Sequence, residues 1–108
     1  MKSQLNKLKC KACEGLEDKL KPKQIKEYLS KLQGWKQKGN SIIKELKFKD
    51  FQSSLNFINK IGKIAEQEDH HPDIEFGWGY ATIKLSTHSL KGLSMNDFIL
   101  AAKIDHLS

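Results

Sequence analysis

The feature that most constrains the fold of this 108-residue chain is a run of apolar residues at helical spacing, "FQSSLNFINKIGKIAEQE" at residues 51–68. The spacing predicts an amphipathic helix of about five turns, with Asp50 as its N-cap. Pro72 prevents further helix and favours an extended backbone at His71. We expect the apolar stripe to pack across a sheet and to bury the first four of its main residues: Phe51, Leu55, Ile58 and Ile61.

A hairpin pattern stands on each side of this predicted helix. In "GWKQKGNSIIKELKFKD" the turn is expected at residues 38–40, between two alternating segments. In "DIEFGWGYATIKLST", Gly77 and Gly79 bracket a second turn. Ile83 and Leu85 alternate with polar residues on the last strand, so both should face the core. Two hairpins of this kind can join into one antiparallel sheet.

Two more helices are predicted, one at each end of this arrangement. "PKQIKEYLSKLQ" at residues 22–33 has helical spacing and is followed by Gly34. Ser94 and Asp97 have the spacing of a capping box, which should open the helix "NDFILAAKIDHL". The order helix, hairpin, helix, hairpin, helix predicts an α+β fold, a four-stranded antiparallel sheet with three helices packed on one face.

Composition indicates one small globular domain, because 108 residues with 38% hydrophobic content cannot form two separate cores. Residues 1–21 lack periodicity and are predicted to be an irregular segment before a domain at 22–108; the pair Cys10 and Cys13 lies there without further zinc ligands. No apolar run approaches the roughly 20 residues that span a bilayer, and a cytoplasmic location is expected. The net charge of +6 comes from lysine without arginine, which argues against a nucleic-acid partner.

The histidines are unevenly distributed, with His70 and His71 adjacent in "EDHHPD" and His88 near the end of the last predicted strand. These residues, and Asp97 at the start of the last helix, stand at the ends of predicted elements, where working groups on a rigid scaffold are common. Because imidazole gains and loses a proton near neutral pH, the group favours proton transfer. Structural roles and metal binding remain alternatives, although adjacent histidines at such a junction point in different directions.

Two separated clusters, "AEQEDHHPD" and "LSTHSLKGLSMNDF", resemble the signature of the pterin-4a-carbinolamine dehydratase family. The pattern is a glutamate, His-His-Pro, and then Thr-His, Gly-Leu-Ser and Asp at a fixed distance. The similarity extends to "GW" at residues 34–35 and "KFKDF" at 47–51, and so covers most of residues 22–107. "FGWGY" at residues 76–80 departs from the more polar turn of animal members.

The resemblance implies the same fold and a reaction: loss of water from 4a-hydroxytetrahydrobiopterin to give quinonoid dihydrobiopterin, in tetrahydrobiopterin recycling. It implies no cofactor and no metal. The partners that it implies are the pterin substrate, a second copy of the chain in a dimer or tetramer, and functional coupling to an aromatic amino acid hydroxylase. The alternative is a non-catalytic relative that acts like a transcription cofactor or an assembly chaperone.

By the same resemblance, the candidate catalytic residues are His70, His71 and His88, of which His70 and His88 are assigned the acid and base tasks in either order. His71 is expected to position the pterin ring. Glu66, Asp97 and Trp35 are the candidates for binding or orienting the substrate. Glu66 precedes His70 by four residues and should project from the same helix face. Asp97 could cap its helix, bind a site histidine, or do both.

Overall fold

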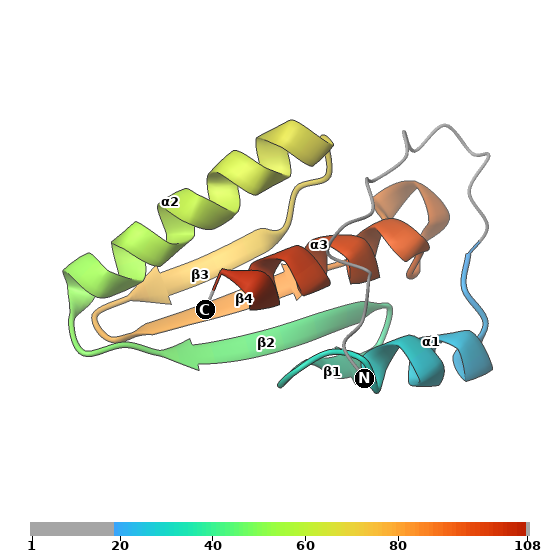
Figure 1. The fold of residues 1–108 in the computed structure, drawn as a ribbon. Coiled ribbons are helices and arrows are strands. Elements are labelled where there is room, and N and C mark those ends of the chain that lie inside the picture. Colours follow the sequence, from blue (N-terminus) through green and yellow to red (C-terminus); the bar gives the residue numbers. More distant parts are fainter. Residues whose placement is uncertain (1–18, 108) are drawn as a thin grey trace.

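The computed structural model describes residues 19–107 and confirms the predicted α+β fold (Figure 1). Its elements follow in the predicted order: α1 (Pro22–Leu29), β1 (Lys36–Lys38), β2 (Ser41–Lys47), α2 (Phe51–Glu68), β3 (Asp73–Gly77), β4 (Tyr80–Leu85), the short 3₁₀ helix η2 (His88–Leu90) and α3 (Met95–His106). Within the described residues, no helix is long and apolar enough to cross a bilayer.

The sheet has the strand order β1-β2-β4-β3, and every neighbouring pair is antiparallel. The two predicted hairpins are therefore joined through β2 and β4, where Ile42 lies opposite Leu85. Gly39 and Gly79, both with positive φ, occupy the two hairpin turns. Since positive φ is readily adopted only by glycine, these two residues set the turns and, through them, the strand register.

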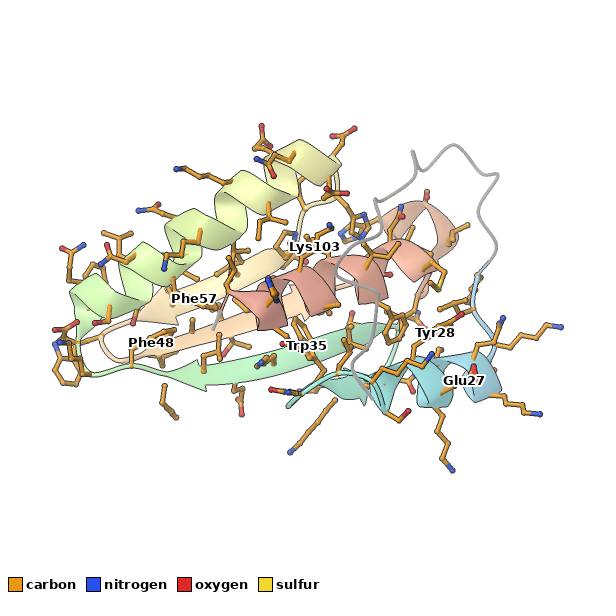
Figure 2. All side chains as sticks on the ribbon, in the orientation of Figure 1. Glu27, Tyr28, Trp35, Phe48, Phe57 and Lys103 are labelled. Carbon is orange, nitrogen blue, oxygen red and sulfur yellow. The ribbon has the colours of Figure 1, made fainter. Side chains whose placement is uncertain are left out.

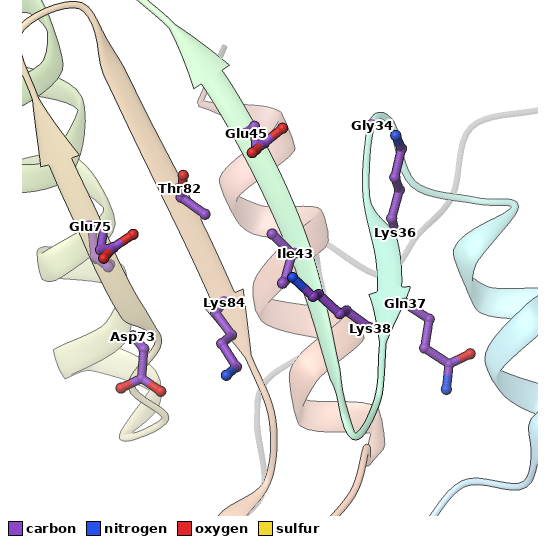
Figure 3. A pocket seen from close by; sticks show the side chains of 11 residues that line it. Gly34, Lys36, Gln37, Lys38, Ile43, Glu45, Asp73, Glu75, Thr82 and Lys84 are labelled. Atoms are coloured by element: carbon purple, nitrogen blue, oxygen red, sulfur yellow. The ribbon is translucent and has the colours of Figure 1, made fainter.

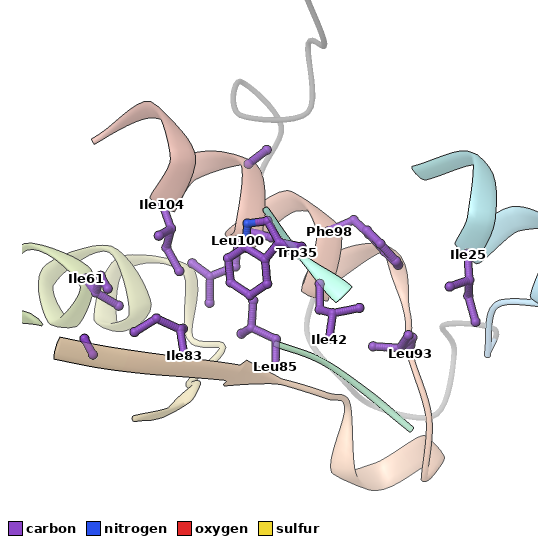
Figure 4. Close-up of a cluster of buried hydrophobic side chains, with 13 residues drawn as sticks. Ile25, Trp35, Ile42, Ile61, Ile83, Leu85, Leu93, Phe98, Leu100 and Ile104 are labelled. Atoms are coloured by element: carbon purple, nitrogen blue, oxygen red, sulfur yellow. The ribbon is translucent and has the colours of Figure 1, made fainter. Parts of the chain in front are cut away.

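The core lies between the sheet and the helices α2 and α3, which cover the same face (Figures 1 and 4). Ile83 and Leu85 are fully buried there, as predicted from their alternation. Phe57 of α2 packs on Phe48 just after β2, with ring centroids 5.5 Å apart (Figure 2). Helix α1 lies beside β1 and adds Ile25 to the same core.

The end of α1 differs from the prediction, because the helix stops at Leu29 instead of continuing to residue 33. Beyond it, Lys31 N donates to the carbonyl of Tyr28 and Leu32 N to that of Leu29. These bonds span three residues instead of four, so the chain tightens into turns before Gly34. Apolar spacing alone does not distinguish the two geometries, since Leu32 packs against the core in either case.

The buried line of α2 also differs from the prediction. Phe51 is 46% exposed, Leu55 and Ile58 are half-buried, and Ile61 is the one of the four expected residues that is fully buried. The centre of the buried face runs instead through Ser54, Ile61 and Ala65. The expectation that Phe51 would be buried was wrong because it lies in the first helical turn, where it stacks on Phe76, 5.8 Å between ring centroids, and leaves one face to solvent.

The predicted irregular segment 1–21, with Cys10 and Cys13, lies mostly outside the described residues. Its last residues belong to the folded part. Leu20 packs against the core, and its backbone N–H donates to the carbonyl of Leu93 at 2.8 Å.

Candidate active site

The junction between α2 and β3 positions the two adjacent histidines. Helix α2 ends at Glu68, and Asp69 then takes a left-handed conformation with φ of 52°. The backbone N–H of His70 still donates to the carbonyl of Ala65 at 3.2 Å, while Pro72 prevents a further helical turn. As a result the His70 side chain turns inward and is 7% exposed, whereas His71 is about half exposed.

His70 forms a buried pair with Asp97, in the first turn of α3. Its Nε2 lies 2.7 Å from Asp97 Oδ1, and the carboxylate is fully buried. Asp97 Oδ2 accepts hydrogen bonds from Ser94 N at 3.0 Å and from the Thr87 hydroxyl at 2.8 Å. The two roles considered for Asp97, helix capping and binding of a site histidine, are thus combined in one carboxylate.

His71 pairs with Glu66, with 2.5 Å between His71 Nε2 and Glu66 Oε2. The expectation that Glu66 would share a face with His70 was wrong, because the left-handed Asp69 turns the chain and brings the next histidine back to the helix. Both side chains are largely exposed. In the described part of the chain, no three His, Cys, Asp or Glu side chains come together in a group that could hold a metal ion.

His88 opens η2 and is not at the end of a strand, because β4 stops at Leu85. The preceding residue, Thr87, pairs with Gly92 in an isolated bridge and so closes the loop that carries His88. This loop forms one wall of a hollow of about 360 Å³, whose lining includes Ser86, His88 and Asp73. His88 is exposed at this hollow.

A larger hollow of about 850 Å³ lies on the open face of the sheet, the face that α2 and α3 do not cover (Figure 3). Charged side chains of both signs line it, among them Lys36, Lys84, Glu45 and Glu75. None of the predicted site residues is among the described residues that line it. The larger volume is therefore not the candidate site, whereas the smaller hollow is lined by one predicted site residue, His88.

Trp35 is the predicted site residue that the structure places elsewhere. It is buried in the core (Figure 4), and its indole N–H donates to Asp105 Oδ1 at 2.9 Å. Asp105 also accepts from the Lys44 ammonium at 2.7 Å and from Gln33 N at 3.0 Å. Sequence reasoning missed Asp105, because no local pattern indicates partners that are more than 60 residues away.

Sequence reasoning also missed Thr87 and Ser94 as members of the site. Both lie inside the stretch "LSTHSLKGLSMNDF" that resembles a family signature, which was the available signal. Together the described contacts assemble a buried histidine–carboxylate pair, an exposed histidine–glutamate pair and a third histidine at a hollow. Imidazoles in such different surroundings can accept a proton at one point and deliver one at another.

Comparison with known proteins identifies the family of this chain. Residues 18–107 match the sequence profile of the family described as pterin 4 alpha carbinolamine dehydratase. A relative from Azoarcus sp. is 41% identical over 110 residues, covering 100% of this chain and 94% of the relative. A relative from Rickettsia bellii is 45% identical over 105 residues, covering 95% of this chain and 93% of the relative. Both carry the provisional name pterin-4-alpha-carbinolamine dehydratase.

Two solved structures have the same fold. A protein from Brucella melitensis described as a transcriptional coactivator/pterin dehydratase superposes with a TM-score of 0.80 at 29% identity, covering 83% of this chain and 98% of that one. A pterin dehydratase-like protein described as a RuBisCO assembly factor in the alpha-carboxysome gives a TM-score of 0.56 at 24% identity. The match covers 68% of this chain and 84% of that one, and it shows a likeness of fold alone. From the profile match and the relatives' identity over nearly their full length, the chain belongs to the pterin 4 alpha carbinolamine dehydratase family.

Proposed function

We propose that this protein is a hydro-lyase that removes water from 4a-hydroxytetrahydrobiopterin and gives quinonoid dihydrobiopterin, in the recycling of tetrahydrobiopterin. The observation that carries the proposal is the hydrogen-bonded connection between two histidine segments. Thr87, directly before His88, donates to Asp97, and Asp97 pairs with His70. Hydrogen bonds thereby join the segment after α2, the loop after β4 and the start of α3, which supports a two-proton reaction at a site that these segments share.

The reaction needs one base and one acid and no redox partner. The proton on N5 leaves, the electron pair of that N–H bond forms the N5–C4a double bond, and the C4a hydroxyl departs as water after it receives a proton. His70 and His88 are assigned to these two tasks. They lie on different elements, so they can approach the pterin from different sides. The proton taken up by one histidine and the proton lost by the other are exchanged with solvent.

His71 and Glu66 are assigned to orienting the pterin. Their side chains are exposed next to the buried pair and can offer a donor and an acceptor to the polar edge of the ring. The pair is exposed, so it contributes little to folding and remains available for substrate. Loss of His71 should therefore raise KM more than it lowers kcat.

Several partners belong to the same proposal. The protein is proposed to act in the cytoplasm as a homo-oligomer, a dimer or tetramer, and to serve an aromatic amino acid hydroxylase that produces the carbinolamine. A non-catalytic binding or assembly role is the alternative. The finding in its favour is that the Brucella protein is described both as a transcriptional coactivator and as a pterin dehydratase. The complete set of His70, His71, His88, Glu66 and Asp97 favours the enzyme, because a scaffold has no use for paired proton carriers.

Steady-state kinetics on single alanine variants tests the proposal. His70→Ala and His88→Ala should each lower kcat by about 10²–10⁴, the range typical of losing a general acid or base. His106, exposed at the end of α3, provides a matched histidine replacement outside the site and should leave kcat unchanged. All assays are run in EDTA, in which the unchanged chain should keep its activity. Normal turnover by both site variants would refute the assignment.

A further inference from the structure

Behind His70 lies a continuous line of buried polar groups. Asp97 and Ser94 are fully buried, and Thr87 is 2% exposed. The Thr87 hydroxyl lies 2.7 Å from the Ser94 hydroxyl and 2.8 Å from Asp97 Oδ2, and Asp97 Oδ1 lies 2.7 Å from His70 Nε2. Hydrogen bonds in such a low-dielectric place are strong, and leaving one unmade is costly.

The number of hydrogens that each group carries determines which group donates in each of these bonds. Asp97 Oδ2 accepts from two donors, the Thr87 hydroxyl and the Ser94 backbone N–H, as the oxygen of a carboxylate does. The Thr87 hydroxyl has one hydrogen, which it gives to Asp97. In its contact with Ser94 it must therefore be the acceptor, so the Ser94 hydroxyl donates to Thr87. Every bond in the line then points toward the carboxylate.

The same reasoning determines which nitrogen of His70 is free. An ionised Asp97 can only accept, so His70 Nε2 must carry a hydrogen and donate it to Oδ1. The Nε2 proton is held there in both charge states of the ring. The proton that the ring gains and loses is then the one on Nδ1.

We infer that Thr87 is a positioning residue that orients Asp97, and that Asp97 in turn fixes His70 as its Nε2–H tautomer, with Nδ1 as the nitrogen that exchanges protons with the substrate. The catalytic meaning of this assignment rests on the proposed function. Thr87 also anchors the His88 loop, because its backbone N–H donates to the Gly92 carbonyl at 2.8 Å and its carbonyl accepts from Leu90 N at 3.0 Å. One residue thereby sets the geometry of both proton-carrying segments.

The test compares Thr87→Val, which keeps the shape but loses the hydroxyl, with Thr87→Ser, which keeps the hydroxyl. Thr87→Val should lower kcat by about 10–100-fold, by analogy with the loss of an outer hydrogen-bond partner of a metal-bound histidine. Thr87→Ser should restore most of that loss. Thr82→Val is the matched control, because Thr82 lies on the open face of β4, outside the hydrogen-bonded line. It should leave kcat unchanged.

The decisive readout is the tautomer itself, measured by long-range ¹H–¹⁵N correlation NMR on the neutral ring, in the alkaline range where the imidazole signals no longer change with pH. The His70 signals are identified by their loss in His70→Ala. The unchanged chain and Thr87→Ser should show Nε2–H, and Thr87→Val a mixture of tautomers. This measurement needs no turnover, so an inactive chain with the Nε2–H form would refute the proposed function and leave the tautomer assignment standing.

Two results would overturn the inference. One is an Nδ1–H or mixed tautomer of His70 in the unchanged chain, which can be measured even if Thr87→Val fails to fold. The other is a Thr87→Val variant whose His70 spectrum and kcat both equal those of the unchanged chain. Thr87→Ala, which also lacks the hydroxyl and is smaller, replaces the valine variant if the latter does not fold.

Discussion

Asp105 joins three parts of the fold and gives a prediction that depends on the structure alone. From the last turns of α3 it accepts hydrogen bonds from Trp35 Nε1, Lys44 Nζ and Gln33 N, at 2.9, 2.7 and 3.0 Å. The side chains of Lys44 and Asp105 are only 12% and 13% exposed. The carboxylate therefore ties β2 and the segment before β1 to the helix that covers them.

Replacing Asp105 by alanine leaves the Lys44 ammonium in this largely buried place without its carboxylate, and leaves two N–H groups without an acceptor. Breaking a buried ion pair from one side costs about 3–5 kcal/mol. We take about 3 kcal/mol, because the long lysine side chain can partly reach water. At about 4 °C per kcal/mol for a domain of this size, the melting temperature should fall by about 12 °C.

Thermal unfolding followed by circular dichroism measures this loss, and Trp35 fluorescence in a Trp78→Phe background shows whether the indole loses its surroundings. Glu45→Ala is the matched control, since it removes the same charge from an exposed position on β2 next to Lys44. Adding Lys44→Met to the Asp105 variant should recover part of the loss, because the unpaired charge is removed. If Asp105→Ala lowers the melting temperature no more than Glu45→Ala, the account of this cluster is wrong.

Gly62→Ala, in the interior of α2, should stabilise the fold by about 1 kcal/mol, because the added carbon would meet nothing within 4 Å beyond the adjacent backbone of its own helix. Gly79→Ala should destabilise the fold, because Gly79 has φ of +80° and the added carbon would lie 3.2 Å from the Phe48 carbonyl oxygen. Chemical denaturation measures the unfolding free energy of both variants, and changes of equal sign would contradict the reasoning. The hydrogen bond from Ser53 N lowers the pKa of Asp50 below its usual value. The stability that Asp50 adds is therefore present above the pKa of Asp50 in the unfolded chain, and it is lost as pH falls through the pKa of Asp50 in the folded chain. The stability difference between the unchanged chain and Asp50→Ala should therefore shrink in acid, and a difference that is constant with pH would exclude this cause. Light scattering at micromolar concentration should give the mass of a dimer or tetramer, and a monomeric mass would count against the proposed assembly.

Most of the fold could be predicted because its signals are local. The alternation of Ile83 and Leu85, the glycines of the hairpin turns and the helical spacing after Asp50 each act within a few residues, and together they leave one simple way to form a sheet with helices. The exact face of α2 was not predictable in the same way. Phe51 has the spacing of a core residue, but it lies at the helix end, where the sheet covers only one side of its ring.

The candidate site was predictable only in part, because Thr87 and Ser94 were missed, Trp35 lies in the core, and the pairings of the histidines were not foreseen. The histidines and Asp97 could be selected from residue type and position, but the partner of each depends on the backbone conformation of Asp69. A left-handed residue there directs His70 to Asp97 and returns His71 to Glu66. Asp is only one of several residues that adopt this conformation, so the sequence does not specify it.

The central claim is that this chain dehydrates a pterin carbinolamine. The most direct test adds the unchanged protein to 4a-hydroxytetrahydrobiopterin that is generated in the cuvette. Ultraviolet absorbance then follows the formation of the quinonoid product. We expect dehydration well above the spontaneous rate, with EDTA present, and a return to the spontaneous rate in a variant that lacks both His70 and His88. A correctly folded chain that leaves the spontaneous rate unchanged would contradict the claim.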